Sequence, residues 1–330
     1  MPVIVALVYP AALHLFFTCE SGLKGSTTAA PILWVGILVS LALAFSAPVV
    51  GLYTAYHASG NSIFHRRLRL ISYLAVASPP LFTLIGVYFD FLIGIANSDY
   101  VVWGCLWTAA GAFIVISGRD LTRVAVPKSA PAWLRVAHGV SALAIVLIFL
   151  AAHLVNHVAG ILSGEVHITV MKVLRVVYRN DYVQPVLLAL FAIQVVSGGW
   201  LLNRHSPEEG NSFKTLQAAS GIFLAVFIAS HTTAVFVIGR RLMNADTNWE
   251  WLTGAPFGML ADPWSVRLIP HYTLAVFLAT AHLACGLRTV LLGHNVAPLT
   301  ADRLAFGTMF VGALGAVLTI SGMLGVHVWT

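Results

Sequence analysis

The chain has 330 residues, of which 59% are hydrophobic and only 9% charged, and its mean hydropathy is +0.88. This composition excludes a soluble globular protein, because too few polar residues are present to cover its surface. The net charge of +6 does not indicate nucleic-acid binding, because most Lys and Arg residues flank apolar runs, where they meet lipid headgroups.

A membrane-spanning helix needs about 20 mainly apolar residues. Eight stretches fit this template, so the chain is predicted to be an all-α, polytopic transmembrane bundle of about eight helices. The N-terminal residues 1–30 form a shorter apolar segment, which is predicted to be interfacial or an additional span. The eight stretches are centred near Leu41, Phe82, Ala110, Ile145, Phe191, Ala225, Val276 and Ala316.

Two pairs of similar segments suggest that a four-helix unit is duplicated in parallel orientation. "HASGNSIFHRRLRLISYLAVA" from His57 resembles "HSPEEGNSFKTLQAASGIFLA" from His205, and "RVAHG" from Arg135 resembles "RLAFG" from Arg303. Shared apolar composition is the alternative explanation. In either case, residues 31–130 form a first membrane segment without candidate ligand histidines, and residues 131–330 form a second bundle.

Basic residues in the loops predict the orientation. If the helices alternate in direction, eleven of the eighteen Lys and Arg residues share one face, which is expected to be cytoplasmic. These residues are Arg66, Arg67, Arg69, Arg119, Arg123, Lys128, Arg135, Arg204, Lys214, Arg288 and Arg303.

The cysteines and histidines limit the metal chemistry. Cys19, Cys105 and Cys285 are isolated, so neither a disulfide framework nor an iron–sulfur or zinc site is indicated. Histidines are costly in lipid unless they have a specific partner, and in a multi-helix chain they indicate haem or proton ligands. Five of them lie inside apolar runs: His138, His153, His157, His231 and His282.

The positions of these histidines predict a haem. His153 lies near the outer end of the helix predicted for residues 133–158, and His231 lies about two turns from the same face in the helix predicted for residues 216–238. Two imidazoles at one depth on facing helices can hold a haem iron between them. The alternative is that both histidines are polar groups in helix packing. His282 lies nearer the inner half, and only His138 can approach it as the partner in a second haem site.

From about Arg135 to the C-terminus, the chain resembles the five-helix cytochrome b membrane anchor of B-type succinate:quinone and fumarate reductases. The matching features are "RVAHG" with a histidine fifteen residues later in "AAHLVNH", then "YRNDYVQPVLLALFAIQVVSGG", "LQAASGIFLAVFIASH" and "YTLAVFLATAHLACGL". They cover about residues 135–330.

The resemblance implies haem b ligated by His153 and His231 near the outer face, and His282 as one ligand of a second haem. The family's other ligand to that haem has no counterpart, because "FAIQVVSGGWLL" at 191–202 contains no histidine. The second haem is therefore absent, or His282 pairs with His138. The resemblance also implies a quinone, flavoprotein and iron–sulfur partner subunits, and a prokaryotic inner membrane location.

A six-coordinate haem b passes single electrons, and its natural small partner in the membrane is a quinone. His157, Asn156, His271 and Tyr272, with His327, are candidates for a quinone site at the outer helix ends. His138 and Arg135 offer an inner alternative. Candidate contacts for haem propionates are Arg175, Arg179, Arg240 and Arg241, which otherwise serve as lipid anchors.

Two other functions fit the sequence. One is a non-redox, parallel-repeat transporter or proton relay that uses the buried histidines. Against it, Asp90, Asp120 and Asp262 are predicted at helix ends or in loops. The other is a redox-sensing haem anchor for a signalling partner. No catalytic dehydrogenase domain is expected, because the chain has no flavin fingerprint or cysteine cluster, and any such chemistry must lie on another polypeptide.

Overall fold

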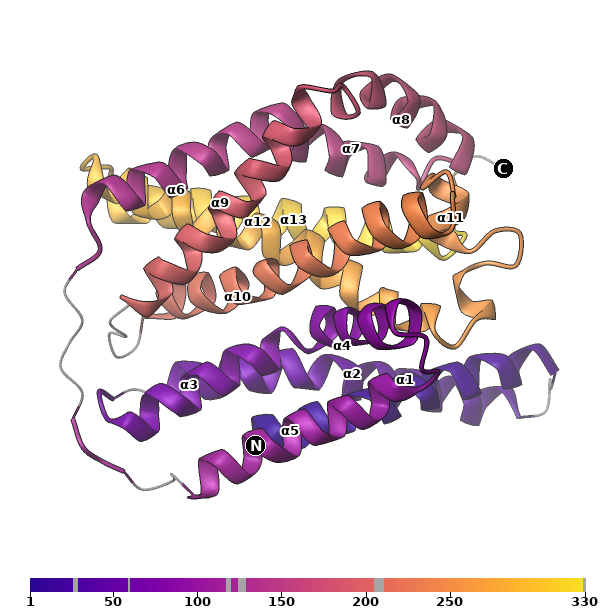
Figure 1. Cartoon of the computed structure of the whole chain (residues 1–330), viewed down its shortest axis with the longest axis horizontal. Coiled ribbons are helices and arrows are strands. Elements are labelled where there is room, and N and C mark those ends of the chain that lie inside the picture. Colours follow the sequence, from indigo (N-terminus) through magenta and orange to yellow (C-terminus); the bar gives the residue numbers. More distant parts are fainter. Residues whose placement is uncertain (26–28, 59, 117–119, 124–128, 205–210, 329–330) are drawn as a thin grey trace. The chain divides into compact units, whose positions relative to one another are not determined.

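The computed structural model describes residues 1–25, 29–58, 60–116, 120–123, 129–204 and 211–328. In these ranges the chain is helical, with no β-strand and a single isolated bridge between Ser62 and Arg123. The helices are labelled in Figure 1. The predicted all-α fold class is confirmed. Arg119 and Lys128, which contributed to the predicted orientation, lie outside the described residues.

The chain forms two compact units. Unit 1 contains Met1–Ala125, Pro207–Ala245 and Pro256–His271, and unit 2 contains Val126–Ser206, Asp246–Ala255 and Tyr272–Thr330. This grouping differs from the predicted segments 1–30, 31–130 and 131–330. The difference arises because α10 (Ser212–Thr232) packs against α3 and α4 of the N-terminal part.

Unit 1 is built mainly from the first five α-helices and α10. Its elements are α1 (Pro2–Gly25), α2 (Ala30–His57), α3 (Ile63–Val76), α4 (Ser78–Gly86), the π-helical η1 (Val87–Leu92), α5 (Ser98–Ile116), α10, the π-helical η3 (Thr233–Leu242), and the 3₁₀ turns η4 (Met259–Ala261) and η5 (Ser265–Arg267). The helix α12 (Leu268–Gly293) begins in this unit and continues in unit 2.

The N-terminal segment is a full-length helix. α1 has 24 residues and packs against α2 and α5. The indole Nε1 of Trp103 donates to the carbonyl of Ala6 at 2.8 Å, and Tyr9 packs edge-on to Phe82, with ring centroids 5.9 Å apart. Of the two predictions for this segment, its length and apolar composition favour the additional span.

The stretch centred near Phe82 differs from its prediction as one helix. It contains two helices, Ile63–Val76 and Ser78–Leu92, which are bent by 68°. Ser62 accepts a hydrogen bond from the His65 N–H and caps α3. Pro79 and Pro80 stand in the first turn of α4, where a missing N–H costs nothing, but they cannot continue the preceding helix. The prolines therefore explain the break.

Unit 2 is built from α6 (Ala132–Ile145), the π-helical η2 (Val146–Leu150), α7 (Ala151–Ala159), α8 (Gly164–Tyr178), α9 (Val183–Asn203), α11 (Trp249–Thr253), most of α12, and α13 (Pro298–Met323). The sequence predicted no helix at α8. This helix begins where the Ser163 side chain accepts from the Val166 N–H. It packs against α7, α9 and α11.

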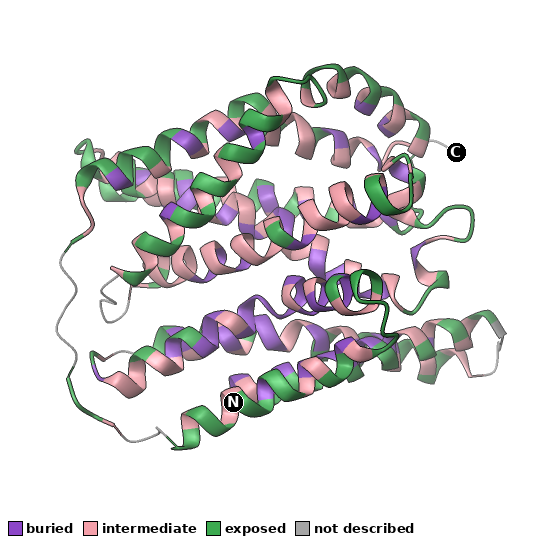
Figure 2. Ribbon diagram, viewed as in Figure 1, coloured by how far each residue is buried: buried purple, intermediate pink, exposed green. Residues whose placement is uncertain are grey.

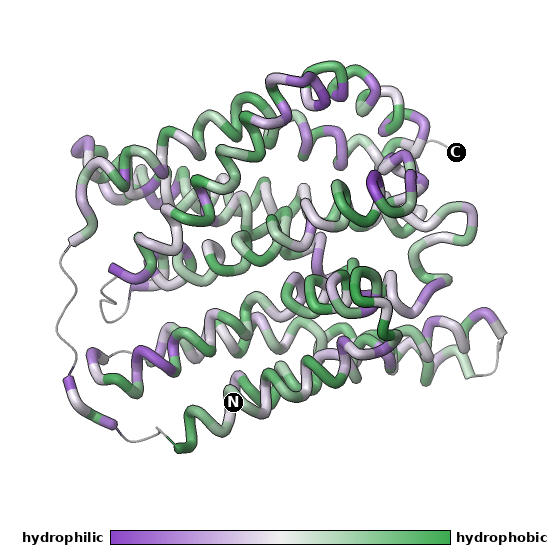
Figure 3. The backbone as a smooth tube through the Cα atoms, viewed as in Figure 1, coloured by the Kyte–Doolittle hydropathy of each residue, from purple (hydrophilic) through white to green (hydrophobic). Residues whose placement is uncertain are grey.

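Among the described residues, eight helices are long and apolar enough to cross a membrane, and the bent α3–α4 pair would add a ninth. Figure 3 shows hydrophobic residues along the lengths of these helices and hydrophilic residues toward many of their ends. The chain is therefore a multi-pass integral membrane protein, as its composition predicts.

Burial differs between helices. In Figure 2 most of α4 is buried, whereas α6 and α9 are largely exposed. The exposed side chains of the α6–α7 run include Val136, Val140, Leu147 and Val155. A continuous set of exposed apolar side chains is unfavourable in water but suits contact with lipid.

Glycine permits one close approach in unit 2, between α13 and the end of α7. A Cβ atom added at Gly322 would lie 2.8–2.9 Å from backbone atoms of Gly160 and Ile161. We expect Gly322→Ala to lower the free energy of unfolding by about 1–3 kcal/mol, because backbone atoms must move apart. SDS titration of the protein in mixed micelles measures this change. Gly307→Ala, on the same helix but facing open space, should leave the free energy of unfolding unchanged or raise it by up to about 1 kcal/mol, because alanine favours a helix more than glycine does.

Candidate functional site

His138 on α6 and His282 on α12 lie close together in unit 2. Their ring centroids are 6.3 Å apart and the rings are inclined at 75°. An imidazole nitrogen binds a transition metal at about 2 Å. The ring centre lies about 1 Å behind that nitrogen, so two imidazoles on opposite sides of one iron have centres about 6 Å apart. The same separation also suits a direct edge-on ring contact, so the hydrogen bonds of the pair carry further information.

The Nδ1 atom of His138 lies 2.8 Å from the Oγ of Ser197 on α9. The Ser197 hydroxyl donates its proton to the carbonyl of Ile193, so it accepts a hydrogen bond from His138 Nδ1–H. The Nε2 atom of His138 then carries the free lone pair. Histidines that bind metals almost always donate the other ring N–H to an acceptor in this way. Ser197 thus holds His138 in the tautomer that an axial haem ligand requires.

Gln194 adds a second polar link between α9 and α6. Its amide nitrogen is 2.8 Å from the carbonyl of His138 and 2.6 Å from the hydroxyl of Ser141. Gly198 is one residue beyond Ser197, and a Cβ atom there would be 3.4 Å from His138 Cε1. Neither Ser197 nor Gln194 was predicted from the sequence. Gln194 and Ser197 are polar residues three positions apart in an otherwise apolar helix, and this spacing, which places both on one helix face, is the sequence pattern that could have indicated them.

His153 lies on a helix face shared with two other rings. Its imidazole stacks on Phe149, with centroids 4.5 Å apart, and lies 4.6 Å from the ring of His157. The Tyr178 hydroxyl of α8 donates to the carbonyl of Phe149. Because Phe149, His153 and His157 are four residues apart, their rings lie along one face of the helix.

His231 lies in the last turn of α10 in unit 1. Its ring stacks on Phe227, with centroids 5.3 Å apart and an inclination of 10°. Phe227 also contacts His271, with centroids 4.8 Å apart, and His271 is 1% exposed. An imidazole N–H of His271 donates to the carbonyl of Pro79. Because His153 belongs to unit 2 and His231 to unit 1, their pairing around a haem remains a prediction.

The four residues of the predicted quinone site are also divided between the two units. Asn156 and His157 lie on α7 in unit 2, with Tyr272 assigned to unit 2 and His271 to unit 1. Within unit 2, Asn156 and His157 contact His167 of α8, which was not predicted as part of the quinone site. His327, beyond α13, has its Nδ1 3.0 Å from the carbonyl of Gly160.

Two of the predicted propionate contacts have protein partners. Arg175 lies 2.6 Å from the carboxylate of Asp246 and donates to the carbonyl of Thr247. Arg179 lies 3.6 Å from the same carboxylate. These contacts join α8 to the segment before α11. In unit 1, the Arg240 guanidinium lies over the ring of Phe236.

A buried ion pair in unit 1 was not predicted. Arg267 Nη1 lies 2.7 Å from Asp99 Oδ2, and the two side chains are 3% and 0% exposed. The guanidinium also lies over the rings of Phe82 and Trp264, with distances of 4.3 and 4.6 Å. Gly86 gives the pair its space, because a Cβ atom there would collide with the guanidinium. The pairing could not be recognised from the sequence, because the two residues are 168 positions apart.

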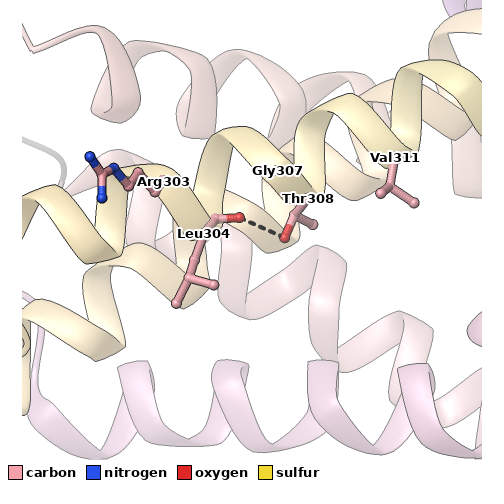
Figure 4. A pocket seen from close by; sticks show the side chains of 5 residues that line it. All are labelled: Arg303, Leu304, Gly307, Thr308 and Val311. Atoms are coloured by element: carbon pink, nitrogen blue, oxygen red, sulfur yellow. Dashed lines mark hydrogen bonds between the residues drawn. The ribbon is translucent and has the colours of Figure 1, made fainter.

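The surface depression on α13 does not form a binding site. Figure 4 shows a shallow depression whose lining residues, Arg303 to Val311, come from α13 alone, with Thr308 donating to the carbonyl of Leu304. A surface formed by a single helix does not enclose a ligand. No cluster of three or more metal-binding side chains occurs in the described ranges, whereas axial haem ligation needs only two.

His167 gives one pH-dependent prediction. It is 3% exposed, and burial lowers its pKa from 6.5 to about 4, with a smaller contribution from Arg175. Between these values the unfolded chain binds a proton that the folded chain excludes, so stability falls as the pH falls through this window. At pH 4 this effect of His167 lowers the free energy of unfolding by on the order of 3 kcal/mol relative to pH 7. SDS titration at pH 4.5 and 7 should show a smaller pH dependence for His167→Phe than for the wild type. His294→Phe, at an exposed position, should behave as the wild type.

No protein-family model matches this chain, and neither the curated proteins nor the solved structures contain a match. The resemblance to the cytochrome b anchors therefore rests on the sequence motifs alone.

Proposed function

We propose that this chain is a haem b-containing membrane protein that transfers electrons to or from a membrane quinone. The observation that carries the proposal is the histidine pair of unit 2. His138 and His282 have the spacing of two axial ligands, and Ser197 holds His138 in the tautomer that leaves Nε2 available for iron. Direct ring packing alone does not require this tautomer.

The residues around the pair suit the cofactor. Haem b would supply one-electron transfer at this site. His138 and His282 would hold it, and Gln194 fixes the backbone of His138 on α6. Gly198 has no side chain, so α9 leaves space beside the imidazole of His138. The pairing of His153 with His231 around another haem, with Arg240 as a propionate contact, stays a prediction from the sequence, because these residues belong to different units. Arg175 and Arg179 can serve this role only in competition with Asp246.

The resemblance extends the proposal to a cellular role. The chain is proposed as the membrane anchor of a succinate- or fumarate-oxidoreductase-like complex in a prokaryotic inner membrane. Flavoprotein and iron–sulfur subunits would dock on the basic, cytoplasmic face. A redox-sensing anchor would use the same haem sites with a signalling partner in place of these subunits.

A proton relay or transporter is the second candidate, and one observation favours it. The Asp99–Arg267 pair is fully buried in a protein of apolar helices, and ionisable groups in such places often mark ion or proton pathways. Haem content separates the two candidates, because the relay requires none.

The test is a pyridine haemochrome assay and a reduced-minus-oxidised spectrum of the protein purified in detergent from cells supplied with haem. A b-type spectrum with at least one haem per chain is expected. Protein that folds but contains no haem would contradict the proposal and leave the relay as the stronger candidate.

A further inference from the structure

Three arginines of unit 1 gather where α3 begins. Arg66 and Arg67 are within the first five residues of this helix, and the backbone of Arg123 forms an antiparallel bridge with Ser62, the residue that caps it. The segment 120–123 is held there by hydrogen bonds from the first two N–H groups of α3. Arg66 and Arg123 are exposed and Arg67 is half-buried. These three arginines form the basic cluster of unit 1.

The basic cluster carries more charge than its protein neighbours neutralise. Hydrogen bonds from the side chain and backbone of Thr122 lower the pKa of Asp120, and the charge of Arg67 lowers it further, so this carboxylate is ionised at neutral pH. It is one negative charge beside three guanidinium groups. Among the described residues, none of the ion pairs within 4 Å includes a member of the cluster. The cluster therefore keeps an excess of positive charge.

Apolar side chains next to the cluster face the membrane. The guanidinium carbon of Arg67 lies 4.8 Å from the centre of the Phe113 ring on α5. Phe113 is exposed, as are Val115 and Ile116 at the end of the same helix and Leu70 on α3. Exposed apolar side chains on membrane helices contact acyl chains, and an arginine at their edge holds its charge at the level of the headgroups.

We infer that the basic cluster of unit 1 binds the headgroup of an anionic phospholipid, whose acyl chains lie against the exposed ends of α3 and α5. The N–H groups of a guanidinium match the oxygens of a phosphate, and basic side chains at a membrane surface attract anionic lipids. A lipid fits better than an acidic protein, because the cluster is continuous with side chains that face acyl chains. The inference concerns unit 1 alone and does not depend on the proposed haem.

Phosphatidylglycerol and phosphatidylcholine are the probes. With the same acyl chains, both contain a phosphate, but phosphatidylcholine adds a positive charge that cancels it. Native mass spectrometry of the protein in detergent, titrated with each lipid, measures the two apparent Kd values. Phosphatidylglycerol should bind at least about tenfold more tightly. Glycerol phosphate, which lacks acyl chains, should not displace it at equal concentration.

Variants locate the site. Arg66→Gln, Arg67→Gln and Arg123→Gln should each weaken phosphatidylglycerol binding by about fivefold, with a smaller effect on phosphatidylcholine, and the triple variant should lose the preference. Arg303→Gln is the matched control. It removes the same charge from another exposed arginine of the face predicted to be cytoplasmic, on α13 in unit 2, and its preference should equal that of the wild type. Thermal unfolding verifies that each variant is folded.

Equal binding of the two lipids to the wild type overturns the inference and leaves an acidic protein surface as the partner of the cluster. This comparison needs no variant. A preference that survives in the triple variant also overturns it, as does an equal loss in Arg303→Gln, because the attraction would then reflect the charge of the whole face. Displacement by glycerol phosphate would show that the cluster binds free phosphate esters rather than lipid, and would likewise overturn the inference.

Discussion

Arg267→Leu is expected to destabilise the folded protein by about 3–5 kcal/mol, because it leaves the carboxylate of Asp99 buried without its partner. The carboxylate is 0% exposed, and the guanidinium is its ion-pair partner at 2.7 Å. Burial of an unpaired charge is more costly than loss of a surface contact, since the charge gives up its hydration without compensation. SDS titration in mixed micelles measures the loss, and a reduced yield of folded protein is expected with it.

The double variant Arg267→Leu/Asp99→Leu distinguishes this explanation from a loss of packing. When both charges are removed, most of the stability should return, because apolar replacement of a buried pair is often neutral or stabilising. Arg288→Leu is the control. Its partner is Asp302 at 2.6 Å, but these side chains are 21% and 34% exposed, so the expected loss is about 0–1 kcal/mol. A single variant as stable as the wild type would show that Asp99 does not depend on Arg267.

On the proposed function, His282→Ala and His138→Ala are each expected to lower the haem content by one per chain, because each variant removes one of the two imidazoles that would hold the iron. The two variants should lose the same haem, so their reduced-minus-oxidised difference spectra should match each other. The pyridine haemochrome assay gives the haem content. His294→Ala, later on the same polypeptide beyond α12, should keep the wild-type content.

Ser197→Ala tests the hydrogen-bond acceptor that orients His138. The variant removes the acceptor for His138 Nδ1–H, and loss of such a partner typically weakens metal affinity by about 10–100-fold. Haem should therefore be lost on dilution or at lower haem supply, while His138 itself is still present. Unchanged haem content in both histidine variants would refute the unit 2 site. His153→Ala and His231→Ala then test the other proposed pair by the same assay.

The helical membrane fold could be predicted from sequence because apolar runs of sufficient length require few other assumptions. All eight predicted stretches contain helices. The break at Pro79 and Pro80 was missed because the hydropathy of the stretch is continuous across the prolines. α8 was missed for the opposite reason, since its basic and apolar residues alternate at helical spacing and no long apolar run marks it.

The candidate site was less predictable than the fold. The possible pairing of His138 with His282 was recognised from their approximate depth, and the structure brings the two rings together. Ser197, Gln194 and His167 could not be recognised in this way, because their roles depend on which helix faces become neighbours. Asp99 and Arg267 illustrate the same limit, since charges that appear to end two separate helices are buried against each other in the folded chain.

The π-helical segment η2 separates His138 from His153 within an otherwise α-helical run from Ala132 to Ala159. A π segment accommodates one residue more than the α-helix around it. Deletion of a single residue from Val146–Leu150 would therefore restore regular α-helix geometry. The residues before and after the deletion would still point to the same sides of the helix as before. This short stretch is therefore the place where the run from Ala132 to Ala159 can gain or lose a residue while His138 and His153 keep their faces, whereas an insertion elsewhere between them would rotate one imidazole relative to the other by about 100°.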